Sequence, residues 1–132
     1  MRRAARLVLA GLALAATAAP AAATGTISCA APTASVTAEL SIGRVPGLAV
    51  VGARITAEGQ TWSIEGNKAT PIVVAQAFTD GRLYQVDFAD ANVEAIVAEL
   101  RLSRADERRD AAMAGTLRLP GLGAWPVVCV GE

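Results

Sequence analysis

Only two cysteines occur in this chain of 132 residues, and they lie near opposite ends of it, at Cys29 and Cys129. Without a third cysteine, a single intramolecular disulfide is available to the chain. In the chain-entropy model, closing a loop of about 100 residues stabilises a fold by about 4.7 kcal/mol. This is a large share of the roughly 5–15 kcal/mol that separates a folded domain from its unfolded state. We therefore predict a Cys29–Cys129 disulfide that holds the two ends of the domain together.

The N-terminus predicts that the chain reaches an oxidising compartment. Three arginines among the first six residues precede an uncharged apolar run over 7–19, and small residues follow at 21–23. This order is typical of a secretory signal peptide. We predict a cleaved signal peptide at 1–23, a single domain at 24–132, and a secreted or periplasmic location. No stable membrane span is expected after cleavage, because the run is shorter than the roughly 20 apolar residues that a span requires.

The charge balance disfavours nucleic acid as a partner. The whole chain has 12 basic and 12 acidic residues, and loss of the leader removes three arginines, which leaves a net charge of −3. Binding to nucleic acid depends mainly on cations that neutralise phosphates. We therefore expect no nucleic-acid partner, and we also expect a monomer that requires no cofactor.

Most of the domain alternates apolar and polar residues, which is the pattern of half-buried strands. Turn signals separate the alternating segments at spacings typical of sandwiches and barrels. The prediction is an all-β fold, a single antiparallel β-sandwich or small barrel of about eight strands closed by one terminal disulfide. Two early strands are expected to point these residues inward: Val36, Ala38, Leu40 and Ile42, and then Val51, Ala53, Ile55 and Ala57.

Two later segments carry more specific expectations. Asp80-Gly81 is a strong two-residue hairpin signal, and it would place Phe78 on one face with Tyr84, Val86 and Phe88. The segment 93–104 fits a helical stripe as well as a strand, so a short helix near 92–104 is the alternative. We favour the strand, because 111–119 alternates again and would pair with it around the charged segment between them.

The domain contains no histidine, which excludes histidine-dependent catalytic and metal sites. Asp87, Asp90, Asn92 and Glu94 gather carboxylates, but their spacing lacks the glycine and the pattern of a calcium loop. We interpret them as an Asx-type turn beside a solvated strand face. The sequence thus predicts no catalytic residue, no metal ligand and no enzyme activity.

The most distinctive hydrophilic segment is Arg104 to Asp110, in which six of seven residues are charged. It is either a hairpin end kept soluble by charge or a protruding recognition loop. Arginine forms bidentate contacts with carboxylates, which favours a role in recognition. The candidate partner-binding residues are Arg104, Asp106, Glu107, Arg108, Arg109 and Asp110.

The layout of a leader, one cysteine near each end and about eight strands resembles the small periplasmic lysozyme inhibitors of the c-type class. The Ser-Gly-x-x-Tyr loop of those inhibitors is absent here. The resemblance concerns the architecture alone, which does not fix the function. The missing catalytic groups, the disulfide and the charged segment predict a small exported binding domain, inhibitor-like, that contacts another envelope or secreted protein. One alternative is a β-barrel carrier of a small apolar ligand, for which alanines and glycines would leave room. A carboxylate-based hydrolase built on Asp87 and Asp90 is the second alternative.

Overall fold

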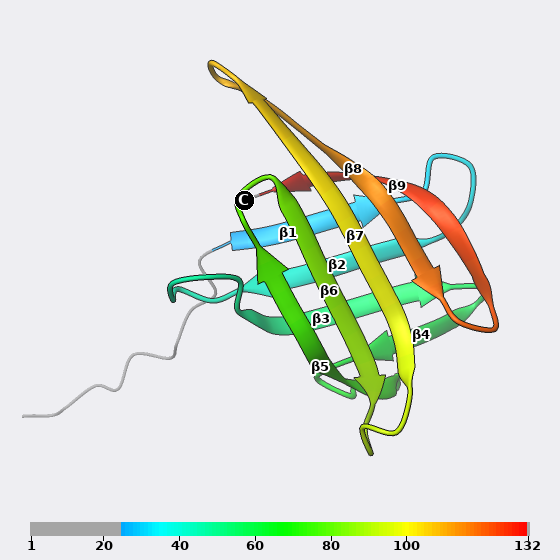
Figure 1. The fold of residues 1–132 in the computed structure, drawn as a ribbon. Helices are drawn as coiled ribbons and strands as arrows, with labels where there is room; N and C mark the ends of the chain where they lie inside the picture. Colours follow the sequence, from blue (N-terminus) through cyan, green and yellow to red (C-terminus); the bar gives the residue numbers. More distant parts are fainter. Residues whose placement is uncertain (1–24, 132) are drawn as a thin grey trace, which may run out of the picture.

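A computed structural model describes residues 25–131, and the predicted signal peptide at 1–23 lies outside the described residues. All of the regular structure in this range is β (Figure 1). The strands are β1 (Gly25–Ala30), β2 (Thr37–Ile42), β3 (Val50–Ala57), β4 (Gln60–Ser63), β5 (Thr70–Thr79), β6 (Leu83–Asp90), β7 (Ile96–Glu107), β8 (Asp110–Leu119) and β9 (Gly123–Gly131). Within this range, no helix suitable for crossing a membrane is found.

The strands form a closed barrel in which each strand pairs with the next along the chain, and β9 returns to pair with β1. Antiparallel pairing joins every neighbouring pair except β4 and β5, which run parallel. The all-β prediction is confirmed, and of the two predicted architectures the chain adopts the barrel. The wall contains nine strands rather than about eight. The additional strand is β1, a short segment that contains Cys29 and follows the predicted cleavage point.

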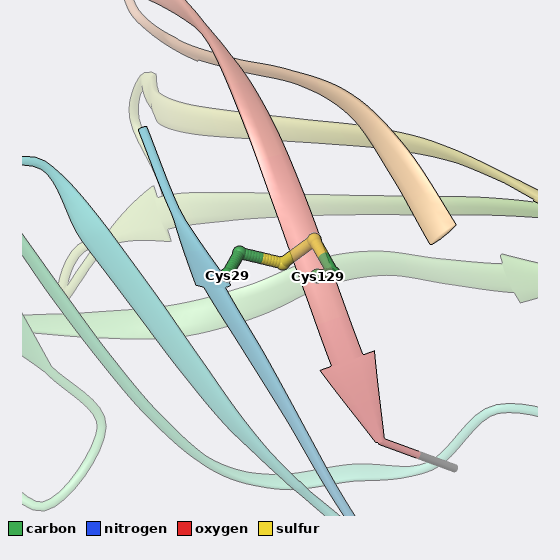
Figure 2. The surroundings of a disulfide bond; sticks show 2 residues. All are labelled: Cys29 and Cys129. Carbon is green, nitrogen blue, oxygen red and sulfur yellow. A yellow bond between two sulfur atoms is a disulfide. The ribbon is translucent and has the colours of Figure 1, made fainter. Parts of the chain in front are cut away.

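The disulfide joins the first strand to the last. Cys29 is the register partner of Cys129, and the bond links their sulfur atoms across the β1–β9 pair (Figure 2). Both cysteines are buried in the core. The predicted pairing is therefore present, and it lies at the pair of strands that closes the wall into a ring. A disulfide is compatible with an oxidising compartment.

The barrel interior is filled by side chains from alternate positions of the strands. The largest fully buried ones include Phe88, whose side chain is not exposed at all, together with Ile27, Leu40, Ile55, Ile72, Leu100, Leu102 and Leu117. Burial of this kind stabilises a fold by roughly 25 cal/mol for each Å² of apolar surface removed from water. The described interior is thus a packed core.

The wall is not equally strong around its circumference. β4 pairs with β5 at only two positions, Trp62 with Thr70 and Ser63 with Pro71. The rest of β5, residues 72–79, pairs with β6 on one side. On its other side no strand of the described part of the chain pairs with it. Backbone groups of β5 that point away from β6 therefore form a strand edge within an otherwise continuous wall.

Two residues that were expected to point inward face outward instead. Val51 is 55% exposed because the β2–β3 register shifts beside it, so that Ser41 pairs with Gly52 and Ile42 with Val50. Phe78 is 49% exposed because it pairs with Gln85. The expected set on one face was Phe78 with Tyr84, Val86 and Phe88.

The Phe78 prediction failed because of a β-bulge in β5 between Val74 and Gln76. Val74 pairs with Phe88 before the bulge and Gln76 pairs with Asp87 after it, so the pairing of β5 with β6 shifts by one residue. A shift of one residue moves a side chain to the opposite face of a strand. For the segment 93–104 the strand prediction is confirmed, because β7 begins at Ile96 and runs through it.

Candidate interaction surface

The charged segment lies in the β7–β8 hairpin, which extends beyond the rest of the barrel wall (Figure 1). The two strands pair continuously from Glu99 and Arg118 to Glu107 and Asp110, and only Arg108 and Arg109 form the turn. β9 accompanies β8 only as far as the pair of Met113 with Cys129. The last residues of the hairpin therefore have no strand beside them from β9. The predicted segment is mostly strand, and it forms a projecting two-stranded ribbon.

Arg104 and Asp106 form the base of this projection. Arg104 is the register partner of Met113, which places it on the inner side of the wall. Its Nε and Nη2 atoms donate to the carboxylate of Asp106 at 2.9–3.1 Å, and its Nη1 donates to the carbonyl of Gly131 at 3.3 Å. These contacts connect β7 to the end of β9. Two of the six predicted binding residues are thus engaged within the protein.

This ion pair changes the acid–base properties of both partners. The hydrogen bond and charge of the Arg104 guanidinium lower the pKa of Asp106 below its ordinary value. The same hydrogen bond to Asp106 raises the pKa of Arg104. Both groups are therefore charged at neutral pH, and each neutralises the other.

The remaining four predicted residues, Glu107, Arg108, Arg109 and Asp110, form the tip. The side chain of Arg108 is 90% exposed, and its Nε lies 3.7 Å from the carboxylate of Glu107. An exposed pair of this kind contributes little to stability. Arg108 also has a φ of 58°, a backbone conformation that favours glycine. The tip thus holds a long cation in a strained conformation, where glycine would fit without strain.

An apolar surface, not predicted from the sequence, adjoins the hairpin on the outer face of the wall. It is formed by outward positions of β6 to β9, where Val128 and Val130 are 56% and 70% exposed. Outer faces of solvated strands are normally polar. We call this surface the apolar wall, and its residues are Leu83, Ala105, Ala112, Ala114, Val128 and Val130.

Part of the apolar wall borders a hollow where β8 and β9 separate. The hollow has a volume of about 510 Å³ and is lined by residues of β7, β8 and β9. Its lining includes Arg104 of β7, Met113 of β8 and Cys129 of β9. The sequence did contain a signal for this surface. If Met113 and Cys129 point inward, then Ala112, Ala114, Val128 and Val130 must point outward.

The carboxylates that the sequence grouped at 87–94 are not brought together as one site. Asp87 forms an ion pair with Arg101 at 2.7 Å. Asp90 Oδ1 accepts hydrogen bonds from the backbone N–H groups of Asn92 and Glu94, both at 3.0 Å. Asp90 thus forms the Asx-type turn that its position predicted. No cluster of three or more potential metal ligands occurs among residues 25–131.

Comparison with known proteins found no matching family model, no matching curated protein and no matching solved structure.

Proposed function

We propose that this protein is a small exported, non-enzymatic binding domain, and that the β7–β8 hairpin is the part that contacts another envelope or secreted protein. The observation that carries the proposal is Arg108, which is 90% exposed at the end of a projecting ribbon and has a φ of 58°. A non-glycine residue in this conformation is unfavourable by roughly 1–3 kcal/mol, and such strain is concentrated at functional sites. Glu58, Lys68 and Val93 also have a positive φ, and Arg108 differs from them in its position at the end of the projecting ribbon.

The composition of the surroundings supports a protein partner. Arginine and apolar side chains are enriched in protein interfaces, whereas lysine is depleted. The tip contains Arg108 and Arg109 and lies beside the apolar wall, while the only lysine of the chain, Lys68, lies on the β4–β5 connection. A partner that contacts both regions would combine charged contacts at the tip with burial of Val128 and Val130.

The two alternatives have less support. A carrier needs an interior space, and the described interior is occupied by Phe88, Leu100, Leu102 and their neighbours. A hydrolase built on the carboxylates would need them free, whereas Asp87 is paired with Arg101 and Asp90 with the backbone. The binding domain is therefore the function that the geometry favours.

A capture experiment with matched variants tests the proposal. The oxidised protein is immobilised and exposed to envelope and supernatant extracts of its host, and the retained proteins are identified. We expect the unmodified protein to retain a partner that Arg108→Ala with Arg109→Ala loses. The control is Arg44→Ala with Lys68→Ala, which removes the same number of exposed cations from other loops. Retention of the same protein by all three forms would contradict a role for the tip.

A further inference from the structure

A second hollow lies on the outer face of the wall over β2, β3 and β4, on strands that do not contribute to the hairpin. Its volume is about 270 Å³, which corresponds to the space of about nine water molecules at roughly 30 Å³ each. Unlike the hollow beside the apolar wall, it is bordered mainly by polar and charged side chains. The lining residues are Glu39, Ser41, Ala53, Arg54, Ser63, Glu65 and Asn67.

Within this hollow, Ser63 holds the carboxylate of Glu65 in place. Ser63 is almost completely buried, and its hydroxyl donates to Glu65 Oε2 at 2.7 Å while accepting from the backbone N–H of Glu65 at 3.1 Å. The other carboxylate oxygen, Oε1, lies over Gly52. A Cβ atom at Gly52 would lie 2.5 Å from that oxygen, which is too close for any real contact. The absence of a side chain at Gly52 therefore provides the space that the Glu65 carboxylate occupies.

Two further charged side chains line the hollow side by side without forming an ion pair. Glu39 and Arg54 are direct register partners on β2 and β3. In the described part of the chain, no ion pair within 4.0 Å joins Arg54 to Glu39 or to Glu65. Glu99 and Arg118 occupy the same kind of cross-strand position on β7 and β8, and they form an ion pair at 2.6 Å. The same two residue types thus pair on one side of the barrel and remain apart in the hollow.

The charges that remain open define a ligand. One guanidinium, Arg54, requires an anion, and two carboxylates, Glu39 and Glu65, require cations. A ligand with only positive charge would meet the repulsion of Arg54, and a ligand with only negative charge would meet that of the carboxylates. We propose that this hollow binds a small zwitterion of the amino-acid type, with its carboxylate at Arg54 and its cationic groups at Glu39 and Glu65. A basic amino acid, with two positive groups and one negative group, matches the set of charges.

Titration calorimetry of the oxidised protein, expressed from its full-length chain, tests this proposal with L-arginine as the probe. We expect saturable binding of L-arginine. Guanidinium chloride and sodium acetate, which each supply one half of the charge pattern, should bind at least about tenfold more weakly at equal ionic strength. Arg54→Gln and Glu39→Gln should each weaken L-arginine binding by about tenfold, a factor that corresponds to about 1.4 kcal/mol. Arg118→Gln, at the matched pair outside the hollow, should leave the affinity unchanged.

Three outcomes would overturn the proposal. The first is the absence of saturable heat with L-arginine up to its solubility limit. The second is binding that neither Arg54→Gln nor Glu39→Gln changes, since the ligand would then occupy another place. The third is guanidinium binding as tight as that of L-arginine and strengthened by Arg54→Gln, which would indicate a simple cation site. Near-ultraviolet circular dichroism establishes that each variant is folded, and Glu39→Gln alters only an exposed side chain.

Discussion

Cys129 lies directly opposite Cys29 across the β1–β9 pair, with 4.0 Å between their Cα atoms. Register partners continue from this pair along one inner level of the barrel, through Met113 on one side and Ala38 on the other. The disulfide therefore belongs to the packed interior, and it connects two positions separated by 100 residues in the sequence. Its loss would affect both the loop that it closes and the strand pair that closes the barrel.

Replacement of both cysteines in Cys29→Ala with Cys129→Ala should lower the free energy of unfolding by about 2–5 kcal/mol. This is the range for removal of a native disulfide from a small secreted domain. Urea denaturation followed by tryptophan fluorescence measures the change. The unmodified protein in reducing agent should approach the double variant. Equal stability of the oxidised protein and the double variant would show that the disulfide does not stabilise the fold.

Replacement of Arg108 by glycine should stabilise the fold by about 1 kcal/mol, because glycine adopts a positive φ without strain. Arg109 provides the matched control, because Arg108 is one of the described non-glycine residues with a positive φ and Arg109 is not. Arg109→Gly should not stabilise. Thermal unfolding of the two variants side by side measures the difference. A lower melting temperature for Arg108→Gly than for Arg109→Gly would refute the strain at the tip.

A methyl group at Gly115 should be poorly tolerated. A Cβ there would overlap the backbone carbonyl of Arg101 on the neighbouring strand, which cannot move without disturbing the β7–β8 pair. We expect Gly115→Ala to destabilise the fold by about 3 kcal/mol or more, in the range of severe packing defects. Thr116→Ala, at the adjacent exposed position, should change stability by less than about 1 kcal/mol. Urea midpoints of both variants provide the comparison.

The pKa values of Asp80 and Asp106 are lowered by different groups, and an acid titration should distinguish the two causes. The pKa of Asp80 is lowered by backbone N–H groups of Leu83 and Arg82, and that of Asp106 by the Arg104 side chain, each from an ordinary value of about 3.8. A carboxyl whose pKa is lowered by folding stabilises the fold above its unfolded pKa, and this contribution disappears as the pH falls through the folded value. The stabilisation from both groups is therefore lost below about pH 3.8.

Carbon-13 NMR of the side-chain carboxyls measures both midpoints. In Arg104→Gln, the midpoint of Asp106 should rise toward its ordinary value, while that of Asp80 should remain low. A coordinated rise of both would point to a general change of the fold in place of two local causes.

Period-two alternation was sufficient to predict an all-β chain, the inner face of β2 and the strand structure of β7 and β8. The disulfide followed from the count of cysteines and the leader. The errors at Val51 and Phe78 have one origin, because each depends on a β-bulge at which the pairing register shifts by one residue. Alternation shows the period of a strand, but it does not show where a bulge changes the pairing register by one residue.

The candidate surface was predictable only in part. Charge density identified the hairpin, yet it could not separate Arg104 and Asp106, which bind one another, from the exposed Arg108. That distinction depends on where β9 stops pairing with the hairpin. It also depends on the carbonyl of Gly131, which binds Arg104 and is 27 residues away from it in the sequence. The polar hollow was not predicted, because Glu39, Arg54 and Glu65 are brought together only by the pairing of three strands.

The β1–β9 and β4–β5 strand pairs differ in strength, and this difference determines where the barrel opens. β1 and β9 are held by a covalent bond, whereas β4 and β5 share two residue pairs. Transient openings of the native protein should therefore begin beside β5, and its backbone amides should exchange with deuterium earlier than those of β1 and β9. The disulfide thus keeps β1 and β9 together, so that local opening of the wall occurs at the edge of β5.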